Sequence, residues 1–183
     1  MSGLYYYYKN VVRPLLISEY NYSDKEAVPS IDYIKVGIVF NNLTGEEDWR
    51  VPMSLKFLSM ITGRKAAIKK LEWSKGGGKE RRMSMNASVT LRKGAAYDFL
   101  EYLIFVVFPL HCRRYGWPSL KVGDGVYNCT FTDLSVFYRQ NEDLVAFDGN
   151  VLLSIVCKGD KKGAGSLLGN LGVPVERIEE EKK

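Results

Sequence analysis

The sequence contains one histidine, His111, and three cysteines among its 183 residues. A single histidine leaves no His-x-x-x-His pair to hold a metal ion. The cysteines Cys112, Cys129 and Cys157 are odd in number and form no C-x-x-C, which argues against a disulfide framework and a four-thiolate zinc site. We therefore expect no metal and no cofactor, and a reducing compartment.

Long apolar runs are also missing. The longest, residues 102–110, is interrupted by Pro109 and is much shorter than the roughly 20 apolar residues that span a bilayer. The first 13 residues lack the apolar core of a signal peptide, and residues 1–30 lack the Arg-rich, acid-poor composition of a transit peptide. No membrane association is expected, while an organelle stays open because a mature or organelle-encoded chain lacks such a peptide.

Enzymatic motifs are incomplete. The G-G-G-K string at 76–79 lacks the spacing of a phosphate-binding loop and has Glu80 where Ser or Thr would hold magnesium. Gly163-Ala164-Gly165 resembles the start of a dinucleotide-binding turn, but the third glycine falls one residue late. His111 beside Cys112 is more often structural than a nucleophile–base pair. We expect no catalysis.

Positive charge is concentrated in one part of the chain. The whole sequence has 26 Lys+Arg and 21 Asp+Glu, a net charge of +5. Residues 64–93 hold ten basic residues against Glu72 and Glu80, so this segment carries +8 and the rest of the chain −3. A merely solvated face is the alternative, but such a concentrated field favours a polyanionic partner.

Length and hydrophobic patterning predict one α+β domain over residues 1–175, followed by a charged tail at 176–183. The expected fold is an antiparallel-rich mixed sheet of about five strands with helices packed on one face. Helices are predicted at 4–20 (kinked or divided at Pro14), 52–62, 95–108 (ended by Pro109) and 161–171. Strands are predicted at 31–40, 66–73, 83–91, 126–131 and 151–157, and residues 112–125 are expected to be irregular.

Residues 66–91 predict a hairpin with a long basic loop. Apolar residues alternate with small polar ones from Met83 to Leu91, which is typical of a half-buried strand. The loop, 74–82, reads S-K-G-G-G-K-E-R-R. Arg92 and Lys93 close the strand and can bind phosphate through charge-assisted hydrogen bonds.

Short strings along residues 4–174 resemble a known family, the universal large-subunit ribosomal protein that binds 5S rRNA, family number five. They are V-V-R-P-L at 11–15, N-Y at 21–22, V-P-S-I-D-Y-I at 28–34, I-T-G-R-K-A at 61–66, V-T-L-R at 89–92, Y-D-F-L at 97–100, V-G-D-G-V-Y at 122–127, L-L at 167–168 and L-G-V-P at 171–174. Each string alone is weak, but their shared order is specific.

The resemblance implies a non-enzymatic constituent of the large ribosomal subunit, located in its central protuberance. It implies contacts with ribosomal RNA (5S, large-subunit rRNA, or both), with peptidyl-site tRNA and with neighbouring ribosomal proteins, including one of the small-subunit head. The rRNA-binding residues expected are Arg64, Lys65, Thr90, Arg92 and Lys93. The tRNA-contact loop comprises Ser74, Lys75, Gly76, Gly77, Gly78, Lys79, Arg81 and Arg82.

Two positions depart from the family pattern. Gly37 stands where the family usually has Asn, and Arg64 where it has Gln, whereas Thr90 is retained. Gly37 offers no side-chain hydrogen bond, and Arg64 lacks the acceptor of a glutamine amide. Such drift favours a mitochondrial ribosome, with another organelle or the cytoplasm as the alternative. Together with acidic residues at 46–48, it supports a second hypothesis, a protein–protein scaffold in a ribosome that has lost its 5S contact.

Overall fold

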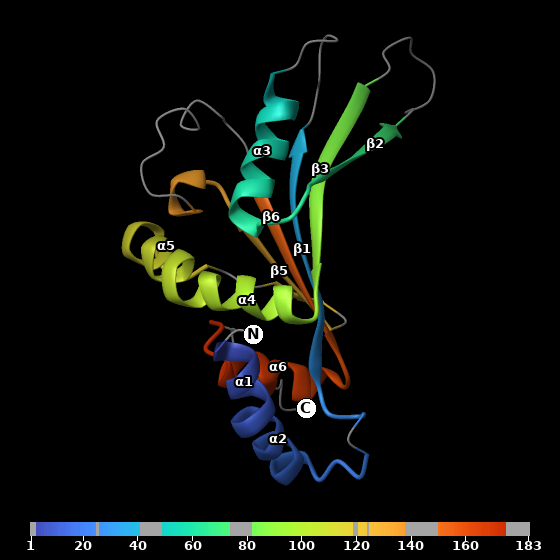
Figure 1. Ribbon diagram of the computed structural model, residues 1–183, viewed down its shortest axis with the longest axis vertical. Helices are drawn as coiled ribbons and strands as arrows, with labels where there is room; N and C mark the ends of the chain where they lie inside the picture. The colour runs from blue at the N-terminus through green and yellow to red at the C-terminus, as the bar shows by residue number, and fades with distance from the viewer. Residues whose placement is uncertain are drawn as a thin grey trace, which may run out of the picture. The chain divides into compact units, whose positions relative to one another are not determined.

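The computed structural model describes residues 3–24, 26–40, 49–73, 82–118, 121–123, 125–137 and 150–174 (Figure 1). The strands of these residues form one six-stranded sheet in the order β2-β3-β1-β6-β5-β4. They are β1 (Ser30–Phe40), β2 (Ala67–Trp73), β3 (Arg82–Arg92), β4 (Lys121–Gly123), β5 (Val126–Phe131) and β6 (Val151–Lys158). The pairs β2–β3 and β4–β5 are antiparallel.

Helical segments come before, between and after these strands. The α-helices are α1 (Gly3–Tyr7), α2 (Arg13–Tyr20), α3 (Arg50–Thr62), α4 (Gly94–Tyr102), α5 (Phe108–Tyr115) and α6 (Lys161–Asn170). Two π-helical segments, η1 (Tyr8–Val12) and η2 (Leu103–Val107), join α1 to α2 and α4 to α5, and η3 (Leu134–Phe137) is a 3-10 turn. The α+β architecture predicted from the sequence is therefore confirmed.

Both long helical runs accommodate an internal proline in the same way. The Arg13 N–H donates to the Tyr8 carbonyl and the Phe108 N–H to the Leu103 carbonyl, each five residues back. A proline then follows within the first two residues of the next α-helix. The predicted division at Pro14 is confirmed, whereas the predicted helix end at Pro109 is wrong, because the widened turn carries the helix on to Tyr115.

The region predicted to be irregular, 112–125, also needs correction. Its first residues complete α5, and Lys121–Gly123 forms β4, which pairs with β5 across a turn. A three-residue strand is too short to leave a period-2 signal in the sequence. The sheet accordingly has one strand more than the five expected.

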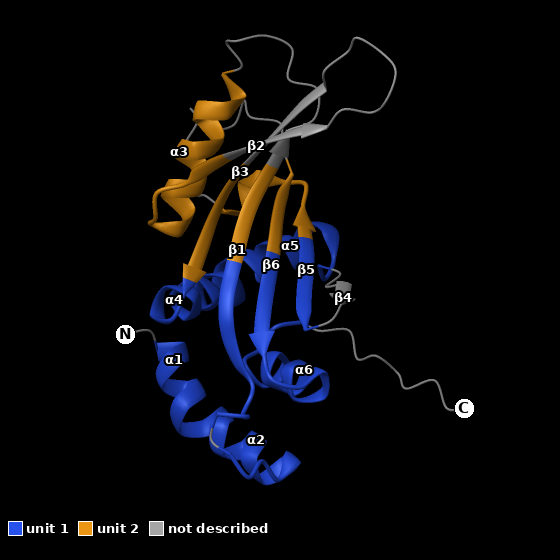
Figure 2. Cartoon of the chain, turned by 90° about the vertical axis from the view of Figure 1, so that its right-hand side faces the viewer, with its two compact units in different colours: residues 1–34, 92–129, 154–183 blue, residues 35–91, 130–153 orange. Residues whose placement is uncertain are grey.

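The chain divides into two compact units (Figure 2). Unit 1 comprises residues 1–34, 92–129 and 154–183. Within it α1 packs on α4 and α2 on α6, and Figure 2 shows α4 and α5 behind the strands. Tyr97 lies at the centre, with ring centroids 5.1 Å from Tyr5 and 5.4 Å from Tyr8, and the Tyr8 hydroxyl donates to the Pro29 carbonyl at 2.9 Å.

The helical run Gly94–Tyr115 is long and apolar enough, by length and composition, to cross a membrane. Its side chains at Leu100, Leu103 and Val107 are completely buried inside unit 1. We therefore interpret it as a core helix.

Unit 2 comprises residues 35–91 and 130–153. The rings of Phe57 and Phe131 lie edge-on to Phe137, with centroids 6.1 and 5.1 Å away, and all three side chains are buried. The prediction of a single domain over residues 1–175 stays a prediction, and the tail at 176–183 lies outside the described residues.

Candidate nucleic-acid interface

Strand β3 carries the predicted RNA-binding residues Thr90 and Arg92 on one face. Ala87, Val89 and Leu91 are at most 4% exposed, whereas Thr90 and Arg92 are exposed. Side chains two residues apart on a strand point to the same side. The alternation predicted for this strand holds from Val89 to Arg92, whereas Ser88, predicted on the polar side, is buried, and the side chains of residues 83–86 lie outside the description. The exposed side of the strand presents a hydroxyl and a guanidinium.

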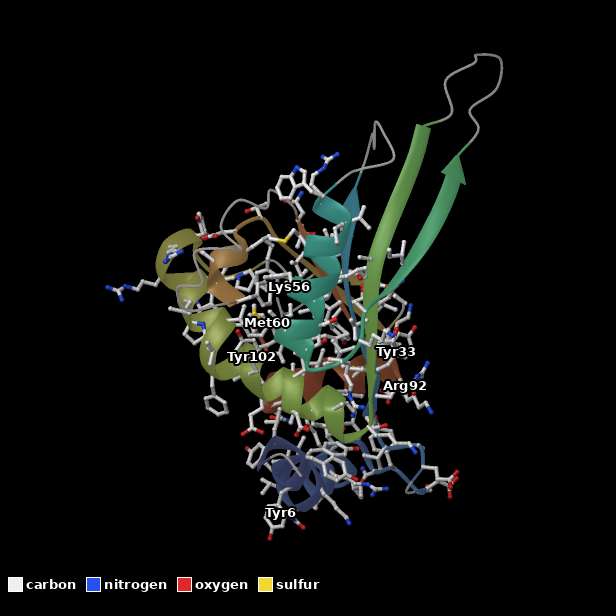
Figure 3. The ribbon with its side chains drawn as sticks, turned by 45° about the horizontal axis from the view of Figure 1, so that its top comes forward. Tyr6, Tyr33, Lys56, Met60, Arg92 and Tyr102 are labelled. Carbon is white, nitrogen blue, oxygen red and sulfur yellow. The ribbon has the colours of Figure 1, made fainter. Side chains whose placement is uncertain are left out.

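Arg92 belongs to a cluster of polar side chains in unit 1. Its Nη1 lies 3.7 Å from Asp32 Oδ1, and its guanidinium carbon lies 4.8 Å from the centroid of the Tyr33 ring. Lys158 Nζ lies 3.4 Å from the same Asp32 oxygen. Figure 3 shows Tyr33 and Arg92 beside each other. Two cations share one carboxylate, so the cluster keeps a net charge of +1 with its cations exposed to solvent.

Strands β5 and β6 also carry polar side chains on one side. Exposed and buried residues alternate on both strands, and Tyr127, Cys129 and Ile155 are on the buried side. On the other side the Ser154 hydroxyl donates to Asn128 Oδ1 at 2.7 Å. Hydrogen-bonding groups on a pleated, half-exposed surface suit contacts to phosphate and ribose.

Lys93 lies at the junction of β3 and α4. It adopts φ 53°, ψ −132°, a left-handed backbone that non-glycine residues rarely take, and its carbonyl accepts from the Ala96 N–H at 3.1 Å. The chain therefore turns directly from the strand into the helix, and the exposed Lys93 side chain stands at that turn, next to Arg92 in sequence.

Arg64 and Lys65 lie in unit 2, between α3 and β2, and both are exposed. Gly63 ends α3 with φ 62°, and the Arg64 N–H donates to Thr62 Oγ1 at 3.3 Å. The β2–β3 ladder begins at the pair Ala67 and Ser88, and before it the Ala66 N–H donates to Ser59 Oγ at 3.3 Å. Arg64 and Lys65 therefore lie in the short connection that leads from α3 into β2, the strand paired with β3.

The predicted tRNA-contact loop belongs to a hairpin, as expected. Strands β2 and β3 pair antiparallel as far as Trp73 and Arg82. Residues 74–81 lie outside the described residues, as do the acidic residues at 46–48. Arg82 is the first residue of β3.

Three members of the interface were not predicted from the sequence, namely Asp32, Tyr33 and Lys158. Asp32 and Tyr33 on β1 contact Arg92, and Lys158 on β6 contacts Asp32, only because these strands are brought together with β3. The sequence feature that could have indicated Lys158 is its place at the end of a strand with alternating burial, but a lysine at such a position is common on protein surfaces.

Other chemistry considered from the sequence finds no site in the described residues. His111 is buried, with Nδ1 3.0 Å from the Gly116 carbonyl oxygen, which is a structural role. The N-terminus of α6 is capped by Asp160, whose Oδ2 accepts from the Gly163 N–H at 2.9 Å, so a carboxylate stands where a nucleotide phosphate would bind. Within the described part of the chain, no group of three or more His, Cys, Asp or Glu side chains forms a candidate metal site.

Comparison with known proteins gives a consistent result, although no family model matches the chain. The chain is 32% identical over 179 residues to the large ribosomal subunit protein uL5c of Emiliania huxleyi, covering 92% of this chain and 94% of that protein. It is 29% identical to uL5m of Reclinomonas americana (97% and 100% covered) and 31% identical to uL5 of Fusobacterium nucleatum (96% and 97% covered). With this similarity over nearly its whole length, and with the fold and string order described above, the chain belongs to the uL5 family, structural and non-enzymatic proteins of the large ribosomal subunit.

Proposed function

We propose that this protein binds ribosomal RNA in the central protuberance of the large subunit through the exposed face of β3 and its neighbours. The observation that carries the proposal is the pairing of Thr90 and Arg92 on one strand face, with Lys93 following and Lys158 nearby through Asp32. Arginine and lysine bind phosphate, and hydroxyls donate to phosphate and ribose oxygens. Shape and backbone contacts of this kind need no base-specific readout.

Binding of purified protein to 5S rRNA and to large-subunit rRNA fragments, measured against salt, tests this site. Replacing Arg92 and Lys93 by Gln should flatten the slope of log K against log salt by about 0.7–0.9 for each phosphate that the variant no longer neutralises. Lys9→Gln removes one charge from an exposed position on η1 and serves as the control. An unchanged slope in the double variant would place the RNA site elsewhere.

We further propose that the hairpin loop contacts peptidyl-site tRNA and that another edge meets a protein of the small-subunit head. The loop sequence supports the tRNA contact. It has four basic residues, Lys75, Lys79, Arg81 and Arg82, and one acidic residue, Glu80, and it includes three consecutive glycines. Charge reversal at Lys79, Arg81 and Arg82 should flatten the salt dependence of tRNA binding by roughly two to three units. Unchanged tRNA affinity would exclude the loop contact.

A second candidate function is a protein–protein scaffold in a mitochondrial ribosome without a 5S contact. Gly37 and Arg64 favour it, because both depart from the family pattern and Arg64 is exposed. The discriminating assay is incorporation of tagged protein into large subunits. If 5S rRNA is bound at this position, Gly37→Asn and Arg64→Gln should strengthen incorporation, each by a hydrogen bond of about 1 kcal/mol. If Arg64 faces a phosphate or an acidic protein, Arg64→Gln should weaken it.

We place the protein in a mitochondrial ribosome. The likeness to uL5m supports this, and the likeness to uL5c and to bacterial uL5 is the reason the location needs its own test. Fractionation of the source cells followed by sequencing of the RNA in the purified parent particle decides both the compartment and the presence of a 5S rRNA. Recovery with cytoplasmic or plastid rRNA would exclude the mitochondrial assignment.

A further inference from the structure

The end of α5 carries a group of arginines and aromatic residues away from β3. Arg113 and Arg114 lie in the last turn of the helix, followed by Tyr115 and, after Gly116, by Trp117. Tyr115 is 59% exposed and Trp117 is 68% exposed, and both arginines are exposed. We refer to Arg113, Arg114, Tyr115 and Trp117 as the α5-end patch (Figure 1 shows α5).

The sequence around the α5-end patch has only positive charges. Between Glu101 and Asp124 there is no acidic residue, whereas Arg113, Arg114 and Lys121 are basic. Cations in the last turn also interact favourably with the helix dipole, which explains part of this bias. The dipole gives no reason for two large aromatic side chains to remain in water next to them.

Exposed aromatic area is the more informative feature. A tryptophan normally buries most of its ring, because removing apolar surface from water is favourable in proportion to the area removed. Trp117 leaves most of that area in solvent, directly after two guanidinium groups and a tyrosine. Two large aromatic side chains this exposed within three residues of sequence, beside two cations, are a candidate binding surface.

The backbone of the α5-end patch is held in place from inside. Buried His111 donates from Nδ1 to the Gly116 carbonyl at 3.0 Å, and its ring centroid lies 5.4 Å from that of Tyr115. The Gly116 N–H donates to the Cys112 carbonyl at 3.1 Å, and φ at Gly116 is +82°. This left-handed residue ends the helix and redirects the chain to Trp117. A surface fixed in this way binds a ligand with little ordering cost.

We propose that the α5-end patch is a second RNA-binding site, which captures an unpaired nucleotide by stacking its base on Trp117 while Arg113 and Arg114 bind the adjoining phosphates. Aromatic rings that stack unpaired bases beside cations that track the backbone are the general means of binding single-stranded RNA. A protein partner would also use Trp, Tyr and Arg, but three cations without a carboxylate over residues 102–123 favour a polyanion. This site is separate in residues from the interface on β3.

The test uses the full chain with Trp49 and Trp73 replaced by Phe, so that Trp117 is the one remaining tryptophan. Titration with an eight-nucleotide oligoadenylate should quench its emission, and an abasic ribose-phosphate oligomer of the same length should not. In an affinity measurement with labelled RNA, Trp117→Ala should weaken oligoadenylate binding by about 5- to 150-fold, the range for removal of one base–aromatic stack. Trp117→Phe should retain part of the affinity.

Controls separate this site from folding and from the β3 interface. Phe105→Ala removes an aromatic ring that is 69% exposed on η2, outside the α5-end patch, and should leave binding unchanged. The double variant Arg92→Gln, Lys93→Gln should show the same quenching of Trp117 emission by oligoadenylate. Absent quenching, equal quenching by the abasic oligomer, or full oligoadenylate affinity in Trp117→Ala overturns the inference, and leaves the proposed function of the β3 face standing.

Discussion

The guanidinium carbon of Arg92 lies 4.8 Å from the centroid of the Tyr33 ring, and its Nη1 lies 3.7 Å from Asp32. Tyr33 and Asp32 are neighbours on β1, so the two contacts together orient a side chain that is itself 60% exposed. An ion pair this exposed adds little to stability. Its consequence is positional, since both contacts favour a guanidinium that lies next to β1 while it stays accessible to solvent.

Asp32→Asn should strengthen RNA binding. The substitution removes the carboxylate that partly neutralises Arg92 and Lys158, so the local net charge rises from +1 to +2. We expect higher affinity at low salt and a slope of log K against log salt that is steeper by up to about one unit. Asp98→Asn, at an exposed position on α4, makes the same change in total charge and is the matched control. Equal effects of the two variants would mean that only the total charge matters.

Leu103→Ala should lower the free energy of unfolding by about 2–5 kcal/mol, because the side chain is completely buried in the widened turn η2. Phe105→Ala, two residues along the same segment at a 69% exposed position, should change it by less than about 0.5 kcal/mol. Urea denaturation of both variants is the measurement. A decrease below about 0.5 kcal/mol for Leu103→Ala would contradict the assignment of this face to the core.

Local patterns predicted most of the helices and strands. Alternation over 83–91 predicted β3 and the burial of Ala87, Val89 and Leu91, because strand periodicity depends only on neighbouring residues, although it did not predict that Ser88 is buried. The extent of the helix beyond Pro109 was not predictable in this way. It depends on a five-residue hydrogen bond from Phe108 to Leu103, and no residue type by itself specifies such a turn.

The interface was predictable only in part, for a related reason. Thr90, Arg92 and Lys93 lie within four residues of sequence, so a strand prediction already places them together. Asp32 contacts Arg92 from β1, and Lys158 on β6 contacts the same carboxylate, and that proximity depends on strand order and register. Long-range pairing of this kind is a property of the whole fold.

Gly163→Ala should destabilise the protein, whereas Gly169→Ala in the same helix should not. A Cβ at Gly163 would overlap the Tyr22 hydroxyl and lie 2.6 Å from Pro29 Cγ. Overpacking of this kind costs about 1–3 kcal/mol. At Gly169 no atom lies within 4 Å of an added Cβ, so alanine should be neutral or stabilise the helix by up to about 1 kcal/mol.

The residues around Gly163 also form the hydrogen bonds that cap the start of α6. The Tyr22 hydroxyl donates to Asp160, whose other oxygen accepts from the Gly163 N–H. Burial alone raises the pKa of Asp160, but these hydrogen bonds outweigh it and lower the pKa below its usual value. Thermal melts of both glycine variants at neutral pH provide the comparison, and equal melting temperatures would refute the steric argument.

Stability should fall at alkaline pH, beginning near pH 9. Burial raises the pKa of the Cys157 thiol from 9.0 to about 12, and burial with the nearby Cys157 raises the pKa of Tyr127 from 10.0 to about 12. The folded state keeps both groups protonated where the unfolded chain ionises, so their contribution is constant below pH 9 and is lost between pH 9 and 12. One such group gives a slope of at most about 1.4 kcal/mol per pH unit.

The buried thiol can be separated from the phenol by substitution. Cys157→Val removes ionisation and keeps the side chain apolar, at the cost of one extra methyl group, so the fall in the urea midpoint should begin nearer pH 10, where unfolded tyrosines ionise, than pH 9. Cys112→Ala controls for removal of a cysteine as such. Urea midpoints of the three proteins between pH 7.5 and 10.5 are the measurement. An unchanged onset in Cys157→Val would show that the Cys157 thiol ionises as readily in the folded protein as in the unfolded chain.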